Sequence, residues 1–125
     1  MPDLSDFNPS NASELVDMII SDVSTEAKSW WNKNSGLMEG YFRSLAEASI
    51  QTAIALQDGR LTKKQADVAF YEQKLAFEST LRFSKLMTLA LAQRIVDSAF
   101  RVIGWAVLNK TGINIAPHLV APKDA

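Results

Sequence analysis

The chain has 125 residues, of which 47% are hydrophobic and 22% charged, the size and composition of one globular domain rather than of a disordered protein. Its net charge of −1 provides no general attraction to nucleic acid or to an anionic membrane. The absence of cysteine excludes a disulfide scaffold, a thiol nucleophile and thiolate metal ligands.

Residues 1–10 predict an extended N-terminal arm, because Pro2 and Pro9 interrupt any regular structure. The arm is acidic where a secretory signal is basic, and no apolar run follows it. The most hydrophobic stretch, residues 86–108, contains three charged residues that oppose a transmembrane helix. We therefore expect a protein of the cytoplasm, or one held within a virion or assembly complex.

Residues 11–57 predict the first helical arm. Asn11 and Glu14 are spaced as in a capping box, which marks a helix start. Apolar residues then recur with a period near 3.6, first from Leu15 to Trp31 and again from Met38 to Leu56. Gly36 separates these two runs, so the arm is expected to be kinked or broken near this residue.

Residues 58–62 predict a tight turn. Gly59 can adopt the left-handed conformation that ends a helix. Thr62 and Gln65 have the spacing of a second capping box, so a new helix is expected to begin directly after the turn.

Residues 63–110 predict one long second helix, since neither proline nor a strong breaker occurs before Thr111-Gly112. Its second half has two adjacent apolar stripes rather than one. Residues 111–125 predict an extended tail, because Pro117 and Pro122 forbid further helix.

The two helical segments are almost equal in length, which predicts a long antiparallel helical hairpin. The numbers of facing residues in such a hairpin sum to about 120. Glu26 is therefore expected near Arg94, and Asp22 near Ser98 and Arg101, which places the acidic start of the chain against its basic second half.

A single hairpin covers one seam of each helix, whereas both segments are apolar over wider faces. We expect two or more copies to bury this surplus as a helical bundle, so that the protein is a dimer or larger homo-oligomer. The terminal arms are a candidate contact with a protein partner. The alternative is a sharp turn at Gly36 that folds three helices into a compact monomer.

The sequence contains no pattern of residues typical of an enzyme. His118 is the only histidine and lies in the tail, and no Glu-x-x-His pair, glycine-rich phosphate loop or serine elbow is present. We expect no catalytic site, no cofactor and no metal ion.

Three tryptophans in so short a chain indicate a large apolar contact. They could form a ligand cradle or a membrane anchor, but we favour burial in the assembled core or between subunits. The predicted oligomer or partner interface consists of the tryptophans and the second apolar stripe: Trp30, Trp31, Leu89, Val96, Phe100, Ile103 and Trp105.

These patterns predict a non-enzymatic, oligomeric helical protein that acts in assembly or in protein–protein interaction. Small helical chains of this form occur among phage and bacterial structural or accessory proteins. Two alternatives from other classes are a peripheral membrane-active helical protein and a small helical nucleic-acid-binding regulator, although neither has a strong signal in the sequence.

Overall fold

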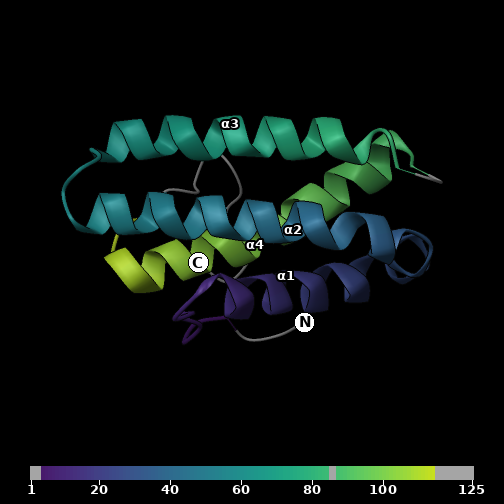
Figure 1. Cartoon of the computed structure of the whole chain (residues 1–125), viewed down its shortest axis with the longest axis horizontal. Coiled ribbons are helices and arrows are strands. Elements are labelled where there is room, and N and C mark those ends of the chain that lie inside the picture. Colours follow the sequence, from purple (N-terminus) through teal and green to yellow (C-terminus); the bar gives the residue numbers. More distant parts are fainter. Residues whose placement is uncertain (1–3, 85–86, 115–125) are drawn as a thin grey trace.

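The computed structural model describes residues 4–84 and 87–114, and all regular structure within these ranges is helical (Figure 1). The expectation of an all-α helical bundle is confirmed. The helices are α1 (Ala12–Glu26), α2 (Lys28–Gln57), α3 (Lys63–Leu81) and α4 (Leu89–Thr111).

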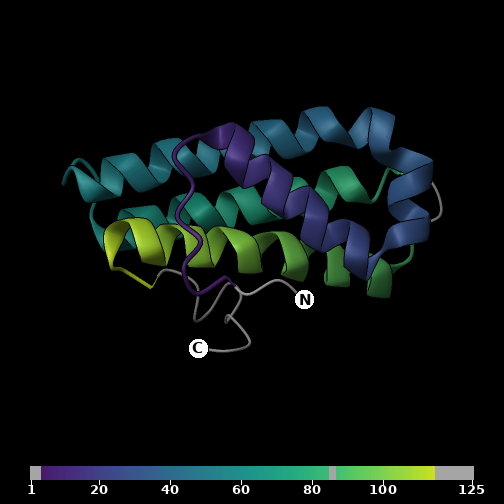
Figure 2. The same cartoon turned by 90° about the horizontal axis from the view of Figure 1, so that it is seen from below.

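Successive helices run in alternating directions along the bundle, so each is antiparallel to the next (Figures 1 and 2). Helices α2 and α4 touch each other and both of the outer helices, whereas the described residues of α1 and α3 do not meet. The central pair therefore separates α1 on one side from α3 on the other. This arrangement is an up-and-down four-helix bundle made by one chain.

The prediction of one continuous helix over residues 63–110 is wrong, because α3 ends at Leu81 and α4 begins at Leu89. The Ser84 hydroxyl and the Ser84 backbone N–H both donate to the Leu81 carbonyl oxygen, at 2.6 and 2.9 Å, so the end of α3 tightens into a turn. The Thr88 hydroxyl then accepts the Leu91 N–H at 3.1 Å and caps the new helix. Apolar periodicity did not reveal this break, since it continues on both sides of it.

The first helical arm also divides at a different place from the one predicted. The break is at Ala27, whose backbone (φ −141°, ψ 55°) is not helical, and α2 continues through Gly36. The Ser24 and Thr25 hydroxyls both donate to the Ser21 carbonyl oxygen and compete with helical bonding just before the break. Figure 2 shows that α2 bends within its first part, which contains Gly36, so the glycine lies in a bent but unbroken helix.

The turn between α2 and α3 has the predicted chemistry. Gly59 has φ +78°, and the Arg60 N–H and Gly59 N–H bond back to the carbonyl oxygens of Ala55 and Leu56, which is a Schellman motif. The Thr62 hydroxyl and the Gln65 side chain bond to each other's backbone N–H, which completes the capping box. Both ends of this turn are therefore determined by local sequence.

Helices α1 and α4 pack in the register predicted from residue numbers that sum to about 120. The Asp22 carboxylate accepts from Ser98 Oγ at 2.6 Å and from Arg101 Nη2 at 2.7 Å. Both charged side chains are at most 3% exposed, so the ion pair lies inside the bundle. The Arg94 guanidinium donates to the Glu26 carbonyl oxygen at 2.7 Å, which fixes the same register at the end of α1.

The described part of the N-terminal arm packs on its own chain. Leu4 is buried, and the Asn109 side chain of α4 donates to the carbonyl oxygens of Leu4 and Phe7 at 3.1 and 2.7 Å. The expected extended tail lies outside the described residues from position 115 onwards, and His118 lies there too.

We expect the same substitution to have opposite effects at two glycines. Gly59→Ala should lower the free energy of unfolding by about 1–2 kcal/mol, because alanine resists a positive φ. Gly40→Ala should raise it by about 0.5–1 kcal/mol, since the glycine is inside α2 and an added Cβ meets no atom within 4 Å. Urea unfolding of both variants measures the difference, and equal changes would contradict the structure.

The buried ion pair gives a second stability prediction. Arg101→Met should lower the free energy of unfolding by about 3–5 kcal/mol, because it leaves the Asp22 carboxylate buried without its cation. Adding Asp22→Leu should restore most of this loss, since an apolar pair replaces both charges. A double-mutant cycle measures the coupling, and additive effects of the two changes would show that the pair is not formed.

Candidate functional site

The structure places most of the predicted interface residues inside the chain's own core. Val96 and Ile103 are fully buried and Phe100 is 1% exposed, packed among α4 and its neighbours. Leu89, at the start of α4, is the exception and is 71% exposed. The surplus apolar stripe that suggested self-association is thus covered within one chain, and substitutions at Phe100 test the core rather than an interface.

The tryptophans at the start of α2 belong to the same core. Trp30 is buried, Trp31 is partly buried, and both rings lie against Phe42, with centroids 6.3 and 5.3 Å away. The Trp30 indole N–H donates to Ser84 Oγ at 2.9 Å, which ties this cluster to the reversal between α3 and α4. Trp105 of α4 is also partly buried against the core.

The exposed apolar side chains are distributed unevenly over the surface. Eight large apolar side chains of the described residues are exposed, and all eight lie between positions 37 and 89. Helix α1 has none of them, and α4 has only its first residue. The other seven lie on α2, on α3 or in the turn after α3. We define the α2–α3 face by six of these, without Ile54: Leu37, Tyr41, Val68, Tyr71, Leu75 and Phe83.

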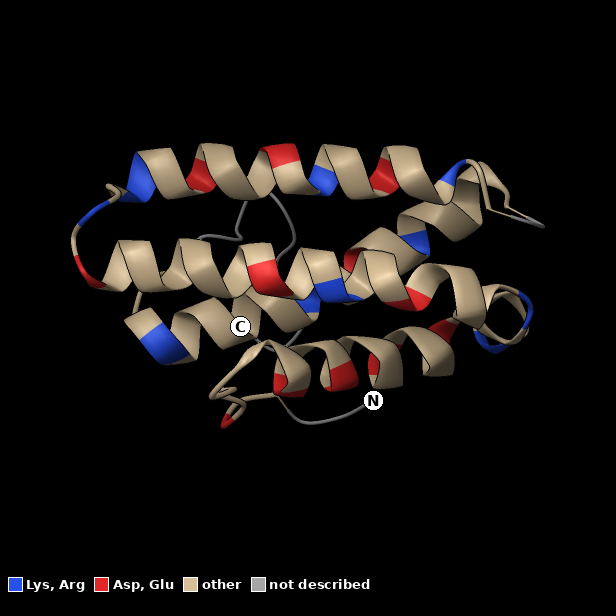
Figure 3. Cartoon of the chain, viewed as in Figure 1, with Lys and Arg blue, Asp and Glu red and all other residues tan. Residues whose placement is uncertain are grey.

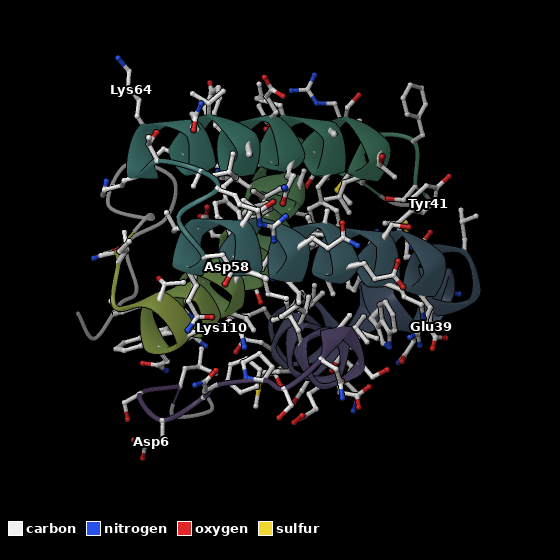
Figure 4. All side chains as sticks on the ribbon, turned by 60° about the vertical axis from the view of Figure 1, so that its left-hand side comes forward. Asp6, Glu39, Tyr41, Asp58, Lys64 and Lys110 are labelled. Carbon is white, nitrogen blue, oxygen red and sulfur yellow. The ribbon has the colours of Figure 1, made fainter. Side chains whose placement is uncertain are left out.

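A shallow trough runs between α2 and α3 on this face. It begins in a hollow of about 270 Å³ bordered by Leu37, Tyr41 and Phe83, and then continues over small residues that include Ala48 and Ala76. A separate hollow adjoins it at Ala48 and is lined by α2 and by the turn residues Arg60 and Leu61. Figure 4 shows Tyr41 at the rim with its hydroxyl pointing outwards.

Helix α3 has a second apolar stripe on its outer side. Val68, Tyr71 and Leu75 are spaced three and four residues apart, so they share one side of the helix. The buried residues of α3 lie on the opposite side and include Phe70 and Phe77. This spacing is visible in the sequence, but the stripe was not predicted, because the buried stripe of the same helix has the same period.

The charges on the α2–α3 face are mixed in sign. Along α3, Lys63 pairs with Asp67 at 3.1 Å and Arg82 with Glu78 at 3.6 Å, and Figure 3 shows acidic and basic residues interspersed on both helices. Lys64 points away from the bundle (Figure 4). The two cations are more than half exposed, whereas the carboxylates of Asp67 and Glu78 are only 17% and 20% exposed.

The described residues hold no group of three or more histidine, aspartate or glutamate side chains placed to bind a metal ion. None of the four helices combines the length and the apolar character needed to cross a bilayer. The clearest surface feature in the described part of the molecule is therefore the α2–α3 face.

We expect the exposed aromatic of this face to contribute little to folding. Phe83 is 88% exposed, so Phe83→Ser should change the free energy of unfolding by less than about 0.5 kcal/mol. Phe77→Ala removes a buried ring and should cost about 3–5 kcal/mol. Thermal unfolding of both variants compares them, and a large loss for Phe83→Ser would mean that this residue serves the core.

Compared with protein-family models, with curated proteins and with solved structures, the chain shows no significant match.

Proposed function

We propose that the protein acts without catalysis, as a homo-oligomeric helical protein of assembly or protein–protein interaction, and that the α2–α3 face is its contact surface. The observation that carries this proposal is the gathering of six exposed large apolar side chains on two adjacent helices. These side chains form two groups, one around the hollow at Leu37, Tyr41 and Phe83 and one along the outer side of α3. Exposed groups of large apolar side chains are typical of interaction sites.

The composition of the face fits a protein partner. Tyr41, Tyr71 and Phe83 are of the aromatic type that is enriched where protein interfaces gain most of their energy. The trough beside Tyr41 lies between two helices and is lined mainly by apolar and small side chains, which suits an apolar segment of a partner. A role in the cytoplasm, or within a virion or an assembly complex, agrees with this reading.

One observation favours peripheral membrane binding as a second candidate. Phe83 and Leu89 are the two most exposed large apolar residues, and both lie near the reversal between α3 and α4, close in sequence to Arg82. An apolar turn beside a cation can insert into an anionic lipid surface. Sedimentation with phosphatidylserine vesicles tests this, and a protein that stays in the supernatant at low salt would exclude it.

The proposed function predicts self-association at micromolar concentration. Sedimentation velocity from 1 to 200 micromolar, a range of about two decades around typical weak interfaces, should report a dimer or larger species. The double variant Val68→Ser/Leu75→Ser should shift the population towards monomer, because it removes apolar surface from the α2–α3 face.

Leu89→Ser is the matched control, since it makes the same kind of change outside this face. It should leave the association unchanged. A wild-type protein that stays monomeric over the whole range would contradict self-association.

A further inference from the structure

Helix α3 has two apolar sides, and the described residues of the chain cover only one of them. The outer residues Val68, Tyr71 and Leu75 are 53%, 48% and 47% exposed, so about half of each side chain is open to solvent. Figure 1 shows α3 at the edge of the bundle, and within the described residues it contacts only α2 and α4. An apolar stripe of this spacing is what a second helix packs against.

The outer stripe of α3 is complementary to the same stripe of a second, antiparallel copy. If a second α3 runs antiparallel and residue numbers across the contact sum to about 143, Val68 faces Leu75 of the second copy. Leu75 then faces the second copy's Val68, and the two Tyr71 side chains meet beside the two-fold axis. The three apolar side chains of each copy are thus in contact with apolar side chains of the other copy.

The charges select this orientation. In the antiparallel register, Lys64 lies opposite Glu78 of the second copy, which joins the ion pair that Glu78 already forms with Arg82. A parallel pairing would place Lys64 and Arg82 against their own copies, so like charges would face each other. A slip of about 4.5 Å from the antiparallel register would bring Lys64 against Arg82.

We propose that α3 packs antiparallel against α3 of a second copy of this chain, about a two-fold axis beside Tyr71. This inference rests on the proposed function and deepens it, because it names the partner and the register. A helix-to-helix contact is smaller than a standard interface of about 800 Å² per partner, so the dimer dissociates in the micromolar range. The trough beside α2 remains free in such a dimer.

The absence of cysteine makes disulfide trapping a direct test. Tyr71→Cys lies beside the proposed axis, so oxidation should form a covalent dimer at 100 micromolar protein, about the concentration at which a weak dimer is populated. Val68→Cys and Leu75→Cys should each remain monomeric when oxidised alone, because each thiol lies about 10 Å along the axis from its own copy. An equimolar mixture of these two variants should form the mixed dimer.

Two further variants serve as controls. Asp17→Cys is exposed on α1, far from the proposed contact, and should not crosslink. Tyr41→Cys reports instead on a dimer formed through the trough and α2. Circular dichroism and a melting curve for every variant show whether its fold is retained.

The outcomes distinguish the proposed α3 pairing from the broader proposal of self-association through the α2–α3 face. Crosslinking of Tyr71→Cys and of the mixture, but not of Val68→Cys alone, supports the α3 pairing. Crosslinking of Val68→Cys alone, or of Tyr41→Cys in place of Tyr71→Cys, overturns the proposed register but keeps self-association through the α2–α3 face. A wild-type protein that is monomeric in sedimentation, with no crosslink at any of these positions, overturns both.

Discussion

Helix α4 is apolar on almost every side, and the rest of the fold is arranged to cover it. Twelve of its 23 residues are buried, among them Gly104 in its interior. One neighbouring helix covers a single stripe, whereas α4 contacts α1, α2 and α3, and Asn109 holds the N-terminal arm across its last turns. The chain reversals at Ala27 and near Ser84 are what allow three helices to reach α4.

The burial of the second half of α4 also encloses Arg101, and this cation determines how α1 docks. A buried guanidinium without a partner would be strongly destabilising, so α1 can approach only where Asp22 meets it. Ser98 binds the second carboxylate oxygen and thereby completes the network. Such a network specifies a register more sharply than apolar packing does, because a shift by one turn would leave both charges unpaired.

The packing of the other helices around α4 explains why exposed apolar side chains are distributed unevenly over the surface. Helix α3 lies at the edge and covers α4 with one side only, and its outer stripe has no partner within the described chain. The α2–α3 face is therefore the part of the fold that intramolecular packing leaves apolar. If α3 pairs as proposed, the same principle extends from one chain to two, since an exposed apolar stripe is again covered by an antiparallel helix.

The sequence alone predicted the turns and helix caps that depend on neighbouring residues. The turn at Gly59 and the capping box of Thr62 and Gln65 were predictable, because each depends on a few residues at fixed spacing. The contact of Asp22 with Ser98 and Arg101 was predicted differently, from the antiparallel register of the two helical segments. Tertiary packing decided that the segment after Thr62 is broken into two helices. The apolar stripe passes through the α3–α4 break, and the break is stable because Ser84 accepts the indole N–H of the distant Trp30 and because folding back buries Val96, Phe100 and Ile103. Periodicity tells which residues are to be buried, but not whether the same chain or another one covers them.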